Sequence, residues 1–278
     1  MNIIIAVSDA FEEFSKKLGL IRYSDLIEKL SSNETGHLVC RDVIAGQGLS
    51  DSEVDYAYCL AMRIGLEKEF KHWHHWNRHP RADCSLSHKQ KPENVLISEP
   101  QRIAEDRFYA NLFLNPQSEL MCDHLTGQHV QGMVLIEACR QMFLAVTELF
   151  CIDGLPTAGR YFAIKDISIN YMEFAFPLPT EIRCHLREKQ QAKADRIAFE
   201  AEIEVWQTQR QVAGMTVRFT VFDAEHLAKH EATLAGKALV RCMSSMKNTI
   251  GSSARESTPC ISTTPPLNHR MDTPQSHL

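Results

Sequence analysis

The sequence lacks the features that mark several large classes of protein. It has no run of basic residues, and 30 Lys and Arg against 35 Asp and Glu leave a net charge of −5, so the electrostatic footprint of nucleic-acid binding is missing. The nine cysteines form no CxxC pair, which argues against a disulfide framework and a thiolate zinc site. No stretch approaches the ~18 consecutive apolar residues of a membrane span, and the first residues lack the basic region of a secretory signal. We therefore expect a cytoplasmic protein with no membrane span and no nucleic-acid partner.

The composition predicts a globular chain with a disordered C-terminal tail. With 278 residues, 44% of them hydrophobic and 23% charged, the chain can bury a sizeable core. Residues 1–85 look α-rich, with a role that the sequence does not give, residues 86–224 look like a strand-rich domain, and residues 225–242 look like a further helix. Residues 243–278 are rich in Ser, Thr and Pro and predict a disordered tail. Within residues 1–85 we expect strands at Asn2–Val7 and His37–Ala45, and helices at Asp9–Lys17, Ser24–Leu30 and Asp51–Phe70, the last opened by a Ser50–Glu53 capping box.

The strand-rich segment surrounds one long apolar helix. Strict alternation of apolar and polar residues predicts strands at Asp166–Tyr171, around Ile182–Leu186, at Arg196–Trp206 and around Met215–Val221, after earlier strands at Asn94–Ile97 and Phe108–Phe113. Residues 132–150 are apolar nearly all round at helical spacing and predict a helix that must be enclosed. An antiparallel sheet of five or more strands wrapped around this helix is a hotdog fold, so we predict an α+β hotdog domain. Its unpaired edge strand favours a homodimer.

A motif at the start of the buried helix carries a family resemblance. Residues 123–141, DHLTGQHVQGMVLIEACRQ, closely resemble the signature of the A-factor biosynthesis (AfsA-like) hotdog family, DHxxGxHVxGMxLxEAxRQ. His88-Lys89, followed by Glu93-Asn94-Val95-Leu96, is similar to the start of a repeat in that family. Members typically carry two such repeats in tandem, whereas this chain has one, preceded by an N-terminal segment of a different kind.

The resemblance implies an acyltransferase that acts on acyl thioesters. The family's activity joins a 3-oxoacyl group from acyl carrier protein to the hydroxyl of dihydroxyacetone phosphate, on the way to butyrolactone signals of secondary metabolism. The expected partners are therefore an acyl carrier protein or coenzyme A (CoA) thioester and a small hydroxylated acceptor. The loop before the helix is also similar to that of 3-hydroxyacyl dehydratases, in which a histidine before the helix and an acid on it transfer protons. His124 and Glu137 stand in that order.

The residues themselves suggest a division of roles. Backbone amides near Gly132 and Met133, at the positive end of the helix, are suited to hold a thioester carbonyl oxygen, and the loop residues Gly127 and His129 would help to bind the substrate. Burial of Glu137 would raise its pKa towards the range of a general base. Arg140, three residues on, would bind a phosphate or orient that carboxylate.

Other interpretations remain open. Glu137 and Arg140 also fit a structural ion pair, and His124 and His129 fit loop histidines bonded to backbone. The same site fits hydrolysis or dehydration of acyl thioesters, and a non-catalytic acyl-binding module is a further possibility. The histidines of residues 72–79 match no established metal spacing, and Gly46-x-Gly48 lacks the rest of a dinucleotide-binding motif. We therefore predict no metal and no cofactor.

Overall fold

The structure is a computed structural model, and it describes residues 2–75, 79–122, 126–152, 159–193 and 196–256. The chain divides into two compact units, Met1–His226 and Leu227–Leu278. The first unit holds two sheets with separate hydrophobic cores. We call residues 2–75 the N-terminal subdomain and residues 79–223 the hotdog domain.

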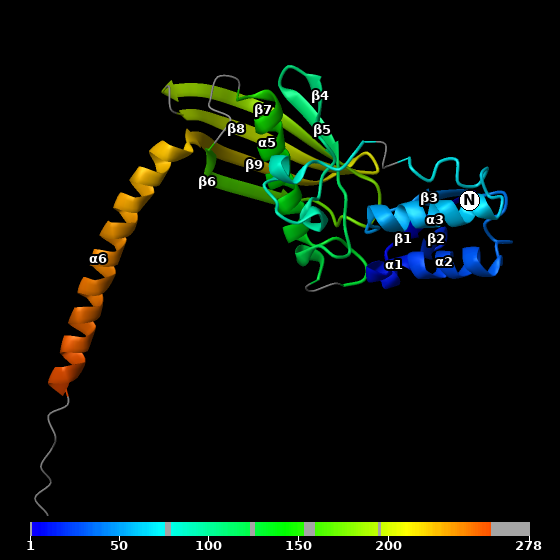
Figure 1. Ribbon diagram of the computed structural model, residues 1–278, viewed down its shortest axis with the longest axis horizontal. Coiled ribbons are helices and arrows are strands. Elements are labelled where there is room, and N and C mark those ends of the chain that lie inside the picture. The colour runs from blue at the N-terminus through cyan, green and yellow to red at the C-terminus, as the bar shows by residue number, and fades with distance from the viewer. Residues whose placement is uncertain (1, 76–78, 123–125, 153–158, 194–195, 257–278) are drawn as a thin grey trace, which may run out of the picture. The chain divides into compact units, whose positions relative to one another are not determined.

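The N-terminal subdomain is built on a small parallel sheet. Strands β1 (Ile3–Val7), β2 (Leu20–Arg22) and β3 (Asp42–Ala45) lie in the order β2-β1-β3 (Figure 1). A 3-10 turn η1 (Asp9–Phe11) and helix α1 (Glu12–Ser15) follow β1, and helices α2 (Tyr23–Ser32) and α3 (Asp51–Arg63) follow β2 and β3. Their apolar faces form one core around Leu26, Val43 and Trp73.

Several expected bounds in this subdomain are corrected by the structure. The expected Ser50–Glu53 capping box is present. The helix that it opens ends at Arg63 rather than Phe70, because Gly65 adopts a positive φ of 82° that a helix does not accept. The expected strand His37–Ala45 begins only at Asp42. Strand β2 was not expected, because three residues are too few to display alternation.

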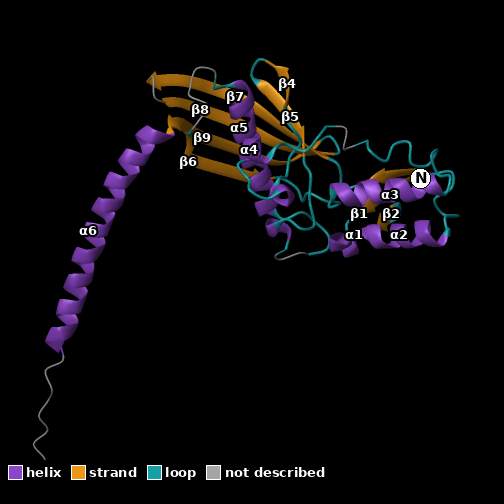
Figure 2. Ribbon diagram, viewed as in Figure 1, coloured by secondary structure: helices purple, strands orange, loops and turns teal. Residues whose placement is uncertain are grey.

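The hotdog domain wraps a six-stranded antiparallel sheet around helix α5 (Gly132–Phe150), as predicted (Figure 2). The strands lie in the order β4-β5-β7-β8-β9-β6. Their bounds are β4 Gln101–Ala104, β5 Arg107–Asn111, β6 Arg160–Tyr171, β7 Thr180–Lys193, β8 Arg196–Gln207 and β9 Arg210–Asp223. Along β8 buried and half-buried residues alternate without interruption, so one face of the sheet packs on α5.

The beginning of the hotdog domain differs from the expectation. Short helices α4 (Cys84–Ser87) and η2 (Pro92–Asn94) occupy part of it, and η3 (Glu119–Met121) comes later. Residues 94–97 form no strand of the sheet. They pair through the isolated bridge Ile97–Leu112, and Gln141 of α5 bonds to the backbone of Asn94 and Leu96. Strand β4 was not expected because its residues are largely exposed and carry no alternating pattern.

Hydrogen bonds, an ion pair between Arg81 and Asp51, and packing of Val7, Phe11 and Phe14 into the hotdog core join the N-terminal subdomain to the hotdog domain. The buried side chain of Gln47 donates to the carbonyl of Leu112 and accepts from the amide of Leu114, as a neighbouring strand would. The amide of Phe14 donates to the carbonyl of Gly127 at 2.9 Å. The ring of Phe14 also stacks on that of Phe176, with centroids 5.4 Å apart. The subdomain therefore holds the loop that precedes α5.

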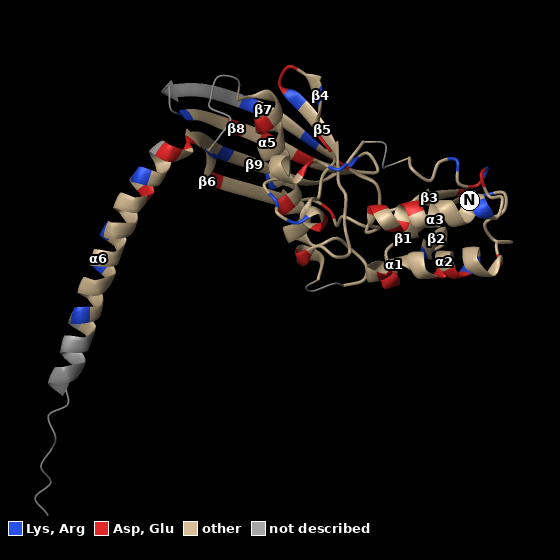
Figure 3. Cartoon of the chain, in the orientation of Figure 1, with Lys and Arg blue, Asp and Glu red and all other residues tan. Residues whose placement is uncertain are grey.

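The second unit is dominated by helix α6 (Ala224–Glu256), which carries Lys and Arg at intervals along its length (Figure 3). The sequence placed the end of this helix near residue 242, so residues 243–256, expected in the disordered tail, are helical instead. Residues 257–278 lie outside the described part of the chain. Among the described residues, no helix combines the length and the apolar character that a membrane crossing needs.

Candidate active site

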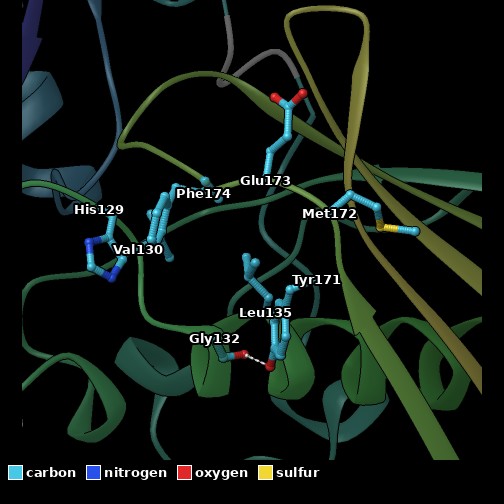
Figure 4. Close-up of a pocket in the computed structure, with 9 residues that line it drawn as sticks. His129, Val130, Gly132, Leu135, Tyr171, Met172, Glu173 and Phe174 are labelled. Atoms are coloured by element: carbon cyan, nitrogen blue, oxygen red, sulfur yellow. Dashed lines mark hydrogen bonds between the residues drawn. The ribbon is translucent and has the colours of Figure 1, made fainter.

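An apolar pocket of about 430 Å³ opens at the N-terminal end of α5 (Figure 4). Three parts of the chain line it: the loop before α5, the first turn of α5, and the segment that follows β6. The lining residues are His129, Val130, Gly132, Leu135, Tyr171, Met172, Glu173, Phe174 and Ala175. The amide of Val130 donates to the carbonyl of Ala175 at 2.8 Å, which fixes the loop to the far wall. The volume lies within the range of small-molecule sites.

Gly132 lies where the helix meets the pocket. The side chain of Gln131, the residue before it, makes no capping hydrogen bond to the first amides of α5. The hydroxyl of Tyr171 donates to the Gly132 carbonyl at 2.9 Å. A Cβ atom at position 132 would lie 2.7 Å from this hydroxyl oxygen, so only glycine allows the approach. The positive end of a buried helix dipole thus borders an apolar pocket, an arrangement suited to an oxygen that gains negative charge.

The loop before the helix contributes one described histidine to the pocket. The Nδ1 atom of His129 lies 3.1 Å from the hydroxyl oxygen of Thr126, and its ring contacts that of Phe174 with centroids 4.8 Å apart. His124, predicted to be catalytic, lies outside the described residues. Gly127, predicted to bind substrate, does not line the pocket. It has a φ of 71° and lies against Glu13 and Phe14 of the N-terminal subdomain.

Glu137 and Arg140 lie together, in a different place. Arg140 donates to Glu137 through Nε at 2.7 Å and through Nη2 at 2.8 Å. Lys89 lies 2.6 Å from the same carboxylate, and Gln141 donates to it at 3.0 Å. The side chain of Glu137 is only 15% exposed. Three donors therefore hold this carboxylate, and neither Glu137 nor Arg140 lines the pocket.

The expected pKa of Glu137 is wrong in direction. Burial is the largest single influence and acts to raise the pKa, but the hydrogen bonds from Arg140, Lys89 and Gln141 together outweigh it and leave the pKa below its ordinary value. A carboxylate in this state is ionised at neutral pH and is a weak base. The geometry thus favours the structural interpretation of the Glu137–Arg140 pair, and the guanidinium is already committed to its neighbour.

The remaining predicted residue, Met133, is 60% exposed and does not line the pocket. Of the predicted set, the structure therefore brings Gly132 and His129 together and places Glu137 with Arg140 elsewhere.

The other two motifs, residues 72–79 and Gly46-x-Gly48, show no ligand site in the part of the chain that the structure describes. Among the described residues, no group of three or more His, Cys, Asp or Glu side chains is arranged to hold a metal. Gly46 and Gly48 serve packing, because Cβ atoms there would lie 2.6 Å from the Ala6 carbonyl oxygen and 2.7 Å from the Ser8 Cβ.

Sequence reasoning missed one wall of the pocket and one ligand of Glu137. Tyr171, Met172 and Phe174 carry a signal, since they are large apolar residues just before the Pro177-x-Pro179 break, and they are 50%, 52% and 69% exposed. Lys89 lies 48 positions from Glu137, and its signal in the sequence is its place in the His88-Lys89 pair, which resembles the start of a family repeat. With His88, which lies 3.3 Å from Glu148, it ties the segment after α4 to two carboxylates of α5.

Comparison with known proteins identifies the family. Among solved structures, a thioesterase from Haemophilus influenzae is 12% identical, covering 47% of this chain and 81% of its own, with a TM-score of 0.35. A mutant thioesterase from Pseudomonas aeruginosa is 11% identical, covering 52% and 96%, with a TM-score of 0.35. A hypothetical thioesterase from Streptococcus pneumoniae with coenzyme A is 15% identical, covering 45% and 86%, with a TM-score of 0.31.

Curated proteins give no match. The profile of the A-factor biosynthesis hotdog domain matches residues 75–223, more than half of the chain. The chain therefore belongs to the A-factor biosynthesis hotdog family.

Proposed function

We propose that this protein is an enzyme that acts on acyl thioesters, with the acyl chain in the pocket at the start of α5. The observation that carries the proposal is the position of Gly132, where the first amides of a buried helix meet an apolar pocket. The amides of Gly132 and Met133 hold the thioester carbonyl oxygen and stabilise the negative charge that it gains when a nucleophile attacks. Loss of one such donor costs about 10²–10³-fold in rate in other enzymes.

The loop before α5 supplies the groups that move protons and bind substrate. In this proposal His124 transfers the proton, as the family resemblance implies. His129 binds the substrate from the pocket wall, with its Nδ1 atom engaged by Thr126. Glu137 and Arg140 act as positioning residues that fix the second turn of α5 against Lys89, which keeps the Gly132 amides in place.

The acceptor decides between two reactions. Acyl transfer to a small hydroxylated acceptor such as dihydroxyacetone phosphate is the activity that the family suggests. One observation favours hydrolysis as a second candidate: none of the nine described lining residues is Lys or Arg, the side chains that would hold the phosphate of the acceptor. Water needs no cation in the pocket. The acyl carrier is either acyl carrier protein or CoA.

We also propose that the protein works as a homodimer paired through β6. This strand has 12 residues and lies at the end of the sheet, bonded to β9 on one side only within the described chain. Its large apolar side chains Tyr161, Ile164, Ile167 and Tyr171 are 39–50% exposed. A long exposed apolar edge is a ready template for a second strand. Pairing there would bring a second copy next to the pocket, because Tyr171 is the last residue of β6 and also lines the pocket.

Product analysis tests the proposed function directly. The full chain is incubated with a 3-oxoacyl thioester of acyl carrier protein or of CoA, with and without dihydroxyacetone phosphate, and the products are identified by mass spectrometry. An acyl ester of the acceptor indicates transfer, and a free acid formed at the same rate without acceptor indicates hydrolysis. Recovery of both thioesters intact would contradict the enzymatic proposal and leave the acyl-binding module.

A further inference from the structure

A second pocket, of about 480 Å³, lies in the N-terminal subdomain. It is formed by the turn between α1 and β2, by one face of α2 and by the segment before β3. Five Lys or Arg residues line it, against two carboxylates, Asp25 and Glu28. A local excess of three positive charges is unusual in a chain with a net charge of −5. The pocket is therefore suited to an anion.

Three of these cations are not neutralised by the protein. Arg22 pairs with Asp25 at 2.8 Å, and Lys16 pairs with Glu13. Within the described residues, by contrast, no carboxylate oxygen lies within 4.0 Å of the side-chain nitrogens of Lys17, Lys29 or Arg41. These three come from different parts of the pocket wall: the turn before β2, helix α2 and the residue before β3. Positive charges brought together without a counter-charge repel one another unless a ligand joins them.

His37 provides an independent sign of a missing ligand. Its ring lines the pocket, and its Nε2 atom is buried without a hydrogen-bond partner in the part of the chain that is described. A buried polar atom left unpaired costs about 1–3 kcal/mol. A bound phosphate places negative charge beside the ring, which favours the protonated imidazole, and the protonated Nε2 atom then donates to a phosphate oxygen.

The edge of this sheet at which ligands usually bind is occupied by contacts within the protein. Ligands of open α/β sheets bind beyond the carboxyl ends of the strands. Here Ser8 and Gln47 follow β1 and β3 at that edge. The amide of Ser8 donates to the Gln47 carbonyl, and the Gln47 side chain bonds to the hotdog domain. The cationic pocket lies at the amino ends instead, next to Ile4, Gly19 and Arg41.

We propose that this pocket binds a phosphorylated small molecule, with Lys17, Lys29 and Arg41 holding the phosphate and His37 hydrogen-bonded to it. The volume suits a ligand of metabolite to nucleotide size. A phosphate ester of this size comes from a free sugar or triose phosphate, or from the nucleotide half of CoA. The site is separate from the pocket at α5 and does not depend on the reaction proposed there.

Binding at this pocket reaches the active-site loop through α1. Ser15, the last residue of α1, lines the cationic pocket. Its neighbour Phe14 donates its amide to the Gly127 carbonyl and stacks on Phe176. A ligand that fixes the turn after α1 therefore also steadies the loop that leads to Gly132.

Isothermal titration calorimetry on the full chain tests the proposal. The probes are inorganic phosphate, dihydroxyacetone phosphate and adenosine 3′,5′-bisphosphate, each titrated at neutral pH and low ionic strength. We expect saturable binding of at least one probe with a Kd at or below ~1 mM, which corresponds to about −4 kcal/mol. Preference for the triose phosphate identifies a free metabolite as the source, and preference for the bisphosphate identifies CoA.

Matched variants decide whether the binding is in this pocket. Lys29→Ala with Arg41→Ala should weaken binding at least ten-fold. Arg63→Ala with Lys68→Ala removes two exposed, unpaired cations of the same subdomain outside the pocket and should leave the Kd unchanged. If the first pair of substitutions disturbs folding by circular dichroism, Lys29→Gln with Arg41→Gln replaces it. Absence of saturable binding for all three probes, or equal affinity of the pocket variant and the unaltered protein, would overturn the proposal.

Discussion

At the scale of single residues, the carboxylate of Glu137 is the most constrained group near the candidate site. Arg140, Lys89 and Gln141 all donate to it, and its pKa lies below the ordinary value. A group whose folded-state pKa is depressed stabilises the fold above its unfolded pKa of about 4.3, and that stabilisation is lost as the pH falls through the lower folded value. The effect of Glu137 should therefore be full at neutral pH and small in acid.

We predict that Glu137→Gln lowers stability at pH 7 by about 1–3 kcal/mol, because two charged donors lose their counter-charge. In thermal denaturation its difference from the unaltered protein should shrink below about pH 4. Glu119→Gln, at an exposed pair with Lys91, is the control and should change the stability much less, because solvent screens that pair. An unchanged melting temperature combined with a rate loss of about 10²-fold or more would assign Glu137 to the general-base role instead.

Gly132 gives a second prediction at this scale. Gly132→Ala places a methyl group 2.7 Å from the Tyr171 hydroxyl and 2.9 Å from its ring carbon, so the tyrosine must move, its hydrogen bond to the Gly132 carbonyl is lost, and the methyl group stands beside the first amides of α5. We expect kcat/KM for acyl thioesters to fall by at least about 10²-fold, the cost of one lost oxyanion donor. Gly236→Ala, in open space on α6, is the control and should have no effect on the rate. Full activity of Gly132→Ala would remove these amides from the mechanism.

At the scale of elements, the sequence predicts those whose pattern is local. Helix α5 begins and ends at the predicted residues, and β8 shows the predicted alternation, because burial of one face imposes a period that the sequence displays. Strand β2 pairs with β1, and Gln141 accepts from the amide of Leu96. Both contacts join residues that are distant in the sequence, so no short window of sequence reveals them. The candidate site likewise has a part that the sequence predicts and a part that it does not. Gly132 belongs to a local sequence motif, whereas the pairing of Lys89 with Glu137 depends on the complete fold.

The edge strand β6 carries a prediction at this scale. Replacing Ile164 and Ile167 together by Glu puts charge on an exposed apolar edge and should convert a dimer into a monomer, because like charges would face each other across the interface. Light scattering at micromolar concentration measures the masses of both proteins. Ile103→Glu, at an exposed apolar position of β4 at the opposite edge of the sheet, is the control and should leave the dimer intact. A monomeric mass for the unaltered chain would contradict the proposed dimer.

At the scale of the whole first unit, one amide side chain joins two domains. Gln47 occupies the place of a strand beside Leu112 and Leu114, so Gln47→Ala leaves a buried carbonyl and a buried amide without partners. Each costs about 1–3 kcal/mol. We predict lower thermal stability and faster hydrogen exchange at residues 126–132, measured by mass spectrometry, because the subdomain also holds Gly127. Gln117→Ala, at an exposed position of the same domain, should change neither.

The separate core of the N-terminal subdomain also has a consequence for synthesis on the ribosome. All of its core residues, from Ile4 to Trp73, precede the hotdog strands in the chain. At about 5–20 residues per second, β9 is completed on the order of ten seconds or more after Trp73. During that interval the parallel sheet can form with nothing to dock on. The nascent hotdog domain then meets a surface that already presents Gln47 and Phe14, and the loop before α5 settles against it as it is made.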